Sequence, residues 1–243
     1  MGKLWVVGIG PGDYEEMTVK AVNALSACDV IVGYQVYIDL IRVHFPGKEY
    51  RATPMRGEVE RCRIALELAQ QGRNVAMICS GDAAIYGMAG LIYALRGENP
   101  DVEVCVVGGL TAAIAGGSRL GAPLGHDFAV ISLSDLLTPW EIIERRLDCA
   151  AAADFVIVLY NPGSHQRREA LRKACDIVLR HQLPETVCGV VQNIGRAGES
   201  TRLLTLRELR NEEVDMFTTV FIGNASSRVI AGAMVTPRGY RDA

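Results

Sequence analysis

The chain has 243 residues, of which 49% are hydrophobic and 22% are charged, and its formal net charge at pH 7 is −3. This length predicts one large domain or two small ones with a sizeable buried core. The slightly negative charge gives no general electrostatic reason to bind nucleic acid or an anionic membrane, so we expect neither as a partner.

The first half of the chain alternates short apolar runs with segments whose apolar residues recur at helical spacing. Strands are expected at residues 4–7, 29–32, 74–79 and 102–107. Helices are expected at residues 18–27, 36–43, 59–71, 84–95 and 111–119. A repeated strand, glycine turn and helix is typical of a mostly parallel sheet, with its loops clustered at the carboxyl ends of the strands.

The second half restarts the alternation after a Gly- and Pro-containing junction at residues 120–125. We therefore expect two α/β domains, at residues 1–120 and 121–243. Strands are expected at residues 128–133, 155–159, 187–192 and 218–222, and helices at 140–147, 168–181 and 206–213. The weaker helices and the Thr- and Val-rich strands are compatible with a mixed sheet in the second domain.

Five predicted strands end in corners rich in glycine or small polar residues. They lie at residues 8–13 (GIGPGD), 80–82 (SGD), 108–111 (GGLT), 160–164 (YNPGS) and 223–227 (GNASS). A single glycine corner is most simply a tight turn. Several in an alternating chain favour a shared ligand crevice beyond the edge of a sheet.

The first corner does not match a dinucleotide site. Its glycines are Gly8, Gly10 and Gly12, and the next helix begins only near Thr18. The second strand is followed by Tyr34 where a ribose-binding acid is needed. A nucleotide-dependent dehydrogenase is therefore the weakest alternative. The chain also contains no P-loop, no G-x-S-x-G elbow and no H-E-x-x-H motif.

Seven cysteines are widely spaced and include no C-x-x-C pair: Cys28, Cys62, Cys79, Cys105, Cys149, Cys175 and Cys188. This pattern argues against a disulfide framework and against a zinc site, so we expect buried thiols and no metal ligands. The sequence shows no signal-peptide pattern and no apolar run of the length that spans a membrane, about 18 residues. We expect a soluble, cytoplasmic protein.

The ordered motifs GIGPGD, SGDAAIYG and GGLTA resemble those of the tetrapyrrole methylases, and the resemblance covers essentially the whole chain. These enzymes use S-adenosylmethionine to methylate ring carbons. Four further stretches resemble the C17-methyltransferase branch: GYQVYIDLI, LGAPLGHDFAVISLSDLLTPW, YNPGSHQR and IGRAGE. That branch acts on precorrin-3B or cobalt-precorrin-3 in cobalamin biosynthesis, and its reaction includes ring contraction.

The resemblance implies two α/β domains with the cofactor in the cleft between them, and a homodimer. It implies a cofactor site formed by Pro11, Gly81, Asp82, Ala83, Tyr86, Thr111, Ala112, Ser132, Leu133, Tyr160, Asn161 and Gly195. The implied substrate is a small tetrapyrrole polycarboxylate. The sequence does not separate a metal-free ring from a cobalt-loaded one.

Three positions depart from the family pattern. Ala83 replaces the proline of the usual G-D-P turn, and Gly108-Gly109 replaces the usual P-G pair. Tyr34 stands where uroporphyrinogen III methylases carry an acidic residue, which argues against that branch.

A polycarboxylate ring needs positively charged contacts, and ring contraction needs proton transfer. The arginine candidates for the first task are Arg56, Arg119, Arg167 and Arg196. The weak candidates for the second are Asp82, His126, Ser134, Asp135 and His165. Two alternatives stay open: methylation at C11 or C20 by an enzyme of the same family, and a module that binds a tetrapyrrole without turning it over.

Overall fold

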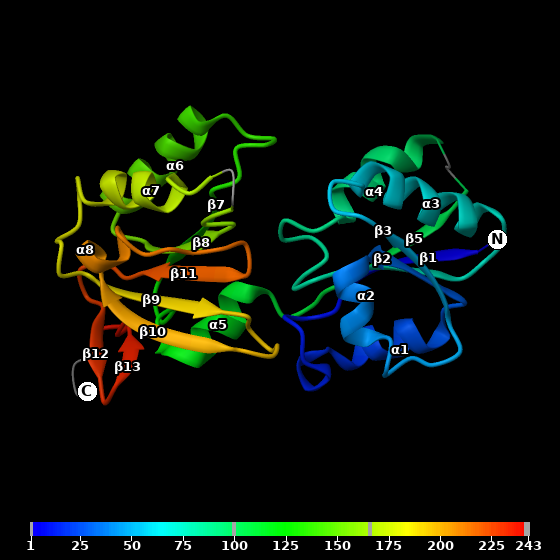
Figure 1. The fold of residues 1–243 in the computed structure, drawn as a ribbon, viewed down its shortest axis with the longest axis horizontal. Coiled ribbons are helices and arrows are strands. Elements are labelled where there is room, and N and C mark those ends of the chain that lie inside the picture. The colour runs from blue at the N-terminus through cyan, green and yellow to red at the C-terminus, as the bar shows by residue number, and fades with distance from the viewer. Residues whose placement is uncertain (1, 99–100, 165–166, 241–243) are drawn as a thin grey trace. The chain divides into compact units, whose positions relative to one another are not determined.

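The computed structural model describes residues 2–98, 101–164 and 167–240, and it divides the chain into two compact units, Met1–Ala112 and Ala113–Ala243. Each unit is built around its own sheet with helices against it, which confirms the expected pair of α/β domains (Figure 1). The domain boundary predicted after residue 120 falls at the end of helix α5 (Ala112–Leu120) and stays a prediction.

The first unit contains a five-stranded, wholly parallel sheet with the strand order β3-β2-β4-β1-β5. Its strands are β1 (Lys3–Gly8), β2 (Val30–Tyr34), β3 (Glu49–Thr53), β4 (Val75–Cys79) and β5 (Glu103–Val107). Its helices are η1 (Tyr14–Glu16), α1 (Val19–Ala27), α2 (Gln35–Ile41), α3 (Glu58–Gln70), α4 (Ala89–Leu95) and η2 (Arg96–Glu98).

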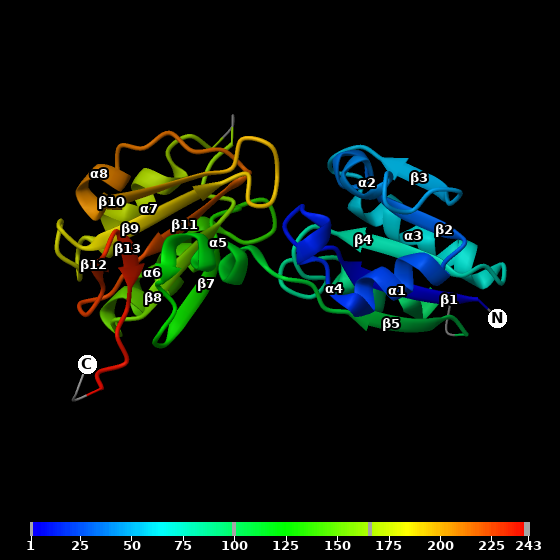
Figure 2. The ribbon, with the colours of Figure 1, turned by 90° about the horizontal axis from the view of Figure 1, so that it is seen from below.

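Side chains that alternate along the strands of the first sheet pack into two hydrophobic cores, one on each face of the sheet. Leu4 and Val6 pack with α3 and α4 on one face, whereas Val7 and Ile31 pack with α1 and α2 on the other. Figures 1 and 2 show the sheet between these two pairs of helices. Because both faces are covered, the central strands are apolar throughout, which explains why sequence periodicity located them.

The connections from β1 and β4 leave their strands in opposite directions. The chain passes from β1 to β2 on one side, and from β4 to β5 on the other. Neighbouring strands of this kind form a switch point, beyond whose carboxyl ends parallel α/β sheets bind ligands. The fold therefore directs attention to residues 9–13 and 80–88.

The second unit has a mixed five-stranded sheet with the order β10-β9-β11-β8-β7, in which only β7 and β8 are parallel neighbours. Its strands are β7 (Phe128–Ser132), β8 (Val156–Tyr160), β9 (Val187–Gln192), β10 (Ser200–Thr205) and β11 (Thr218–Ile222). Three short strands form a second sheet: β6 (Gly121–Ala122), β12 (Arg228–Ile230) and β13 (Ala233–Val235). Besides α5, the helices are α6 (Trp140–Ala152), α7 (Ala170–Val178) and α8 (Leu206–Leu209).

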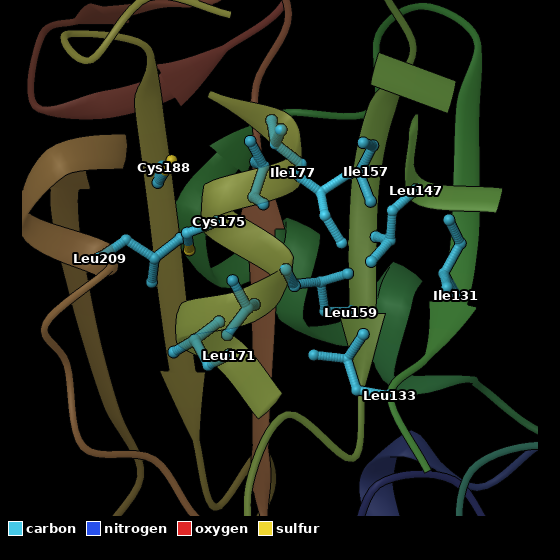
Figure 3. Packing of buried hydrophobic residues seen from close by; sticks show 14 of the residues in the cluster. Ile131, Leu133, Leu147, Ile157, Leu159, Leu171, Cys175, Ile177, Cys188 and Leu209 are labelled. Carbon is cyan, nitrogen blue, oxygen red and sulfur yellow. The ribbon is translucent and has the colours of Figure 1, made fainter. Parts of the chain in front are cut away.

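Helices α6 and α7 bury the larger core of the second unit. Figure 3 shows Ile177 of α7 beside Ile157 of β8, and Cys175 of α7 beside Cys188 of β9. Helix α5 packs on the opposite face of the sheet, where a Cβ atom on Gly116 would stand 3.0 Å from the Phe221 ring. Small residues on α5 thus allow it to approach β11 closely.

The antiparallel direction of β11 corrects one sequence expectation. Val220 pairs with Leu159 and Ile222 with Ile157, so β11 ends at the edge where β8 begins. The corner at residues 223–227 therefore lies at the opposite edge from the corner after Tyr160. Its Asn224 side chain binds within the loop and donates to the Asp154 carbonyl at 3.2 Å. This corner is a structural turn.

Two further expectations were wrong in detail. The helix expected at residues 84–95 begins only at Ala89, because residues 82–88 form a turn around the Asp82 side chain. The edge strands β3 and β10 were not expected at all.

Within the described parts of the chain, no helix is long and apolar enough to cross a membrane, and no cluster of three or more His, Cys, Asp or Glu side chains could hold a metal ion.

Candidate functional site

Three loops of the first unit meet through their backbones at the carboxyl edge of its sheet. Gly10 and Gly81 exchange two hydrogen bonds, with N···O distances of 3.1 and 2.7 Å. A Cβ atom on Gly8 would lie 2.6 Å from the Gly81 carbonyl oxygen, and one on Gly109 would lie 2.2 Å from it. No real Cβ contact is this short. We call Gly8, Gly81 and Gly109 the glycine junction, because only glycine permits it.

The Asp82 carboxylate fixes the loop after β4. Its Oδ1 accepts hydrogen bonds from the backbone N–H groups of Ala84 at 2.7 Å and Ile85 at 3.0 Å. Its Oδ2 accepts one from the Gly109 N–H at 2.9 Å, which ties this loop to the loop after β5. These contacts belong to a carboxylate that holds a turn, and they give no support to Asp82 as a catalytic acid or base.

The other predicted cofactor residues of the first unit lie on the same three loops. Pro11 follows the paired Gly10, and Thr111 is buried with its Cα 3.7 Å from the position of a Cβ on Gly81. Tyr86 is 55% exposed and adopts a φ of 53°, an uncommon conformation for a bulky residue. The structure therefore places the first-unit candidates on the loops after β1, β4 and β5, and their role in binding the cofactor stays a prediction.

Cys79 ends β4 directly before this loop. Its side chain is buried, and its Sγ accepts a hydrogen bond from the Met88 N–H at 3.4 Å. Burial raises the pKa of the Cys79 thiol to about 11, although the Met88 N–H and the positive charge of Arg61 oppose the rise. All seven cysteines are free, and five are buried, as expected from their apolar surroundings.

The second unit gathers its candidates at one edge of its own sheet. The Leu133 N–H donates to the Tyr160 carbonyl at 2.9 Å, and the Asn161 amide donates to Ser132 Oγ at 2.9 Å. Strand β9 ends at the same edge because Gln192 pairs with Thr218, which begins the antiparallel strand β11. The loop that carries Gly195 therefore leaves the sheet beside these residues.

Tyr160 also supports the beginning of α5. Its hydroxyl oxygen accepts a hydrogen bond from the Ala113 N–H at 2.7 Å. The N–H groups of a first helical turn have no partner within the helix, so this bond satisfies one of them.

We expect Tyr160→Phe to lower the free energy of unfolding by about 1 kcal/mol, because the Ala113 N–H loses its acceptor. Urea unfolding followed by circular dichroism measures this change. Tyr93→Phe is the matched control, because Tyr93 is half exposed on α4 and its loss should change stability by less than about 0.5 kcal/mol. Equal effects of the two changes would contradict the assignment.

Arg167 clamps the loops after β7 and β8. Its Nη1 donates to the Leu133 carbonyl at 2.9 Å and to the Asn161 carbonyl at 3.5 Å. Its Nε lies 3.8 Å from an oxygen of Asp135. These contacts assign Arg167 and Asp135 to holding the edge of the sheet, so the structure does not present Arg167 as an open receptor for a substrate carboxylate.

Glu199 holds the loop that carries Gly195. One carboxylate oxygen accepts the Gly195 N–H at 2.6 Å, and the other accepts Nε of Arg119, on α5, at 3.0 Å. The Arg196 guanidinium lies over the Phe217 ring at 5.4 Å. Both arginines, proposed from sequence as substrate contacts, thus have partners inside the second unit.

Glu199→Gln removes the charge from both of these hydrogen bonds. We expect it to lower the free energy of unfolding by about 1–2 kcal/mol, since bonds to a charged group are worth more than neutral ones. Glu185→Gln is the control, because Glu185 pairs with Arg207 at an exposed position, where an ion pair contributes at most about 1 kcal/mol. A larger loss in the control, measured by urea unfolding, would show that Glu199 does not brace the loop.

Comparison with known proteins decides the family. Residues 3–210 match the model of the Tetrapyrrole (Corrin/Porphyrin) Methylases. The chain belongs to the tetrapyrrole methylase family. It is accordingly a methyltransferase, and its methyl donor is S-adenosylmethionine.

Individual relatives of this tetrapyrrole methylase agree. A probable cobalt-factor III C(17)-methyltransferase of Salmonella typhimurium is 49% identical, over 98% of this chain and 99% of that protein. The cobalamin biosynthesis protein CbiHC of Archaeoglobus fulgidus is 48% identical over 98% of this chain, which spans 53% of that longer protein. The crystal structure of the methyltransferase CobJ matches with a TM-score of 0.90 at 33% identity, covering 98% of this chain and 100% of that one.

The first-unit loops of this tetrapyrrole methylase fit S-adenosylmethionine. A Cβ atom on Gly8 or Gly109 would collide with backbone, and Gly81 has a φ of 66°, so the loops meet without side chains between them and leave backbone groups at the switch point. Asp82 already accepts three N–H groups, so most of its acceptor capacity is used in holding these loops. The backbone groups of these loops would hold the methionine part of S-adenosylmethionine by hydrogen bonds.

One predicted catalytic residue of the described chain, His126, is not brought to these edges. His126 precedes β7, at the end of the strand opposite to Ser132, and its Nδ1 accepts a hydrogen bond from the Asp127 N–H at 2.9 Å. His165 lies outside the described residues. Ser134 follows Ser132 at the predicted edge, and its N–H donates to Ser132 Oγ at 3.2 Å. Arg56 lies in the loop between β3 and α3, with a φ of 66°.

Sequence reasoning missed Arg61, a buried arginine of α3 that is only 5% exposed. The signal was present in the sequence. Arg61 precedes Ala65 and Ala69 by four and eight residues, which places it on the apolar stripe of its helix. A charged residue on such a stripe usually has a specific partner.

Proposed function

We propose that this tetrapyrrole methylase transfers a methyl group to C17 of the cobalt-containing ring named in its relatives, cobalt-factor III, with ring contraction, in cobalamin biosynthesis. The observation that carries the proposal is the 49% identity to the Salmonella C(17)-methyltransferase along nearly the full length of both chains. The TM-score of 0.90 to CobJ supports the same branch. The metal-free substrate precorrin-3B is the alternative.

The chemistry needs little from the protein beyond alignment. The cofactor supplies a methyl group already activated by its sulfonium charge. The glycine junction and Asp82 provide rigid loops at the switch point, which orient a bound ligand and exclude water. No nucleophilic side chain of the protein is required. The predicted contacts Ser132, Tyr160 and Gly195 on the second unit stay predictions that cofactor titrations of their variants test.

Calorimetry with S-adenosylhomocysteine tests the cofactor part of the proposal, and we expect a dissociation constant on the order of 1 μM. Absence of S-adenosylhomocysteine binding at millimolar concentration would contradict the cofactor part of the proposal. Incubation with carbon-13-labelled methyl donor and cobalt-factor III then tests the position, read by NMR of the product. Label at C11 or C20 assigns another methylase of the family. Tetrapyrrole binding without formation of S-adenosylhomocysteine assigns a non-catalytic module.

The oligomeric state and the cellular location are also proposals. We propose a homodimer in the cytoplasm, as the family resemblance implies. Light scattering of the purified protein at several concentrations tests the dimer. A monomer mass at every concentration contradicts it.

A further inference from the structure

Arg61 is a buried cation whose contacts in the first unit are all to neutral groups. Its Nε donates to the Thr53 hydroxyl at 2.8 Å, and its Nη2 donates to the Pro54 carbonyl at 3.1 Å. The guanidinium carbon lies 5.9 Å from the centre of the Tyr34 ring. A guanidinium has five N–H groups, so these two hydrogen bonds leave donors over.

Among the described residues, no carboxylate lies within ion-pair distance of Arg61. Buried charges in proteins are normally paired, because removing an ion from water is costly. The position adds to the cost, since Arg61 lies in the fourth position of α3, near the positive end of the helix dipole. Both facts favour an anion that binds here and is supplied by a ligand.

The fold places this cation beside the predicted methyl-donor loops. Tyr34 ends β2, Thr53 ends β3, and the charge of Arg61 acts on Cys79 at the end of β4. Strand β2 is the direct neighbour of β4, whose carboxyl end leads into the loop of Gly81. Parallel sheets bind their ligands at this edge.

We propose that Arg61 binds a carboxylate side chain of the tetrapyrrole substrate at the carboxyl ends of β2 and β3. The inference rests on the proposed function and names a substrate contact for it. Tyr34 and Tyr37 pack edge to face, with ring centres 5.2 Å apart, and give the same place an aromatic surface. A planar ring with acidic side chains matches an aromatic surface beside a cation.

Uroporphyrin, a stable porphyrin with carboxylate side chains, serves as the probe in a fluorescence titration. We expect Arg61→Gln to weaken its binding at least tenfold and to flatten the dependence of affinity on salt. Arg51→Gln is the matched control: it removes a positive charge from β3, but Arg51 is exposed and pairs with Glu49 at 2.7 Å. We expect the control to bind uroporphyrin within twofold of the wild type.

Titration with S-adenosylhomocysteine separates this inference from the proposed function. Equal cofactor binding by the wild type and both variants, with weakened uroporphyrin binding by Arg61→Gln alone, supports Arg61 as the carboxylate receptor. A lower melting temperature of Arg61→Gln with unchanged uroporphyrin affinity overturns it and makes Arg61 a structural link between β3 and α3. Failure of cofactor binding in the wild type counts against the proposed function instead.

A measurement on the wild-type protein covers the case in which Arg61→Gln does not fold. The Nε–H resonance of Arg61 can be followed by NMR and identified through its absence from Arg61→Lys or through its contact with the assigned side chain of Thr53. We expect this resonance to shift on addition of uroporphyrin and to stay in place with the methyl ester of uroporphyrin. A resonance that uroporphyrin leaves unmoved overturns the proposal.

Discussion

Replacement of Gly109 by alanine is expected to weaken binding of S-adenosylhomocysteine at least about 100-fold, the equivalent of about 2.7 kcal/mol. The new Cβ would lie 2.2 Å from the Gly81 carbonyl oxygen and 2.6 Å from two backbone atoms of Gly8. Backbone cannot rotate away as a side chain does, so the loops after β1, β4 and β5 must separate. We also expect the free energy of unfolding to fall by about 2–4 kcal/mol.

Gly90→Ala is the control for this substitution. Gly90 lies in α4 with open space around the position of its Cβ, so alanine there should stabilise the protein by about 0.5–1 kcal/mol through helix propensity. Calorimetric titration measures cofactor affinity, and urea unfolding measures stability. Retention of cofactor affinity within threefold by Gly109→Ala would mean that the glycine junction does not shape the cofactor site.

Asp82→Ala is expected to have the second largest effect. Three backbone N–H groups lose a charged acceptor, and hydrogen bonds to charged groups are worth about 1.5–3 kcal/mol each. Water reaches the exposed turn and compensates in part, so we expect a loss of about 2–4 kcal/mol in the free energy of unfolding. The freed loop should bind S-adenosylhomocysteine about 30-fold more weakly, a change of about 2 kcal/mol.

Two variants check the cause of this effect. Asp82→Asn keeps one oxygen acceptor but turns an N–H donor toward the backbone donors, so it should recover only part of the lost affinity. Asp39→Ala is the surface control, since exposed Asp39 accepts one side-chain hydrogen bond from exposed Gln35 on the outer side of α2. Full cofactor affinity in Asp82→Ala would remove Asp82 from the site altogether.

The strands and corners that sequence reasoning located share a physical property. The central strands β1, β4 and β8 are apolar on both faces because helices cover both sides of each sheet. Two of the four edge strands of the five-stranded sheets, β3 and β10, do not carry this signal, whereas the apolar edge strands β5 and β7 do. Strand β3 reads EYRAT and is largely exposed or half-buried, so neither its composition nor its periodicity separates it from a loop. Strand β10 escaped prediction for the same reason.

The positions of candidate residues could be predicted where they form a turn with their neighbours in the sequence. The roles of residues whose partners are distant in the sequence could not. Gly81 and Asp82 follow a buried strand and mark a tight corner on their own. The roles of Arg119 and Arg167 depend on Glu199 and on the Leu133 carbonyl, which are distant in sequence. The corner at residues 223–227 looked equivalent to the others, because strand direction cannot be read from a single corner.

The burial of Cys79 has a chemical consequence. A sulfonium methyl group reacts with thiolates, and thiols react only through that ionised form. With the methyl donor held at Gly81–Ala83 as proposed, Cys79 lies two residues before that turn in the chain. A pKa of about 11 leaves roughly one such thiol in ten thousand ionised at pH 7. Burial of this thiol at the end of β4 therefore keeps it in its unreactive, protonated form next to the loop proposed to hold the methyl donor.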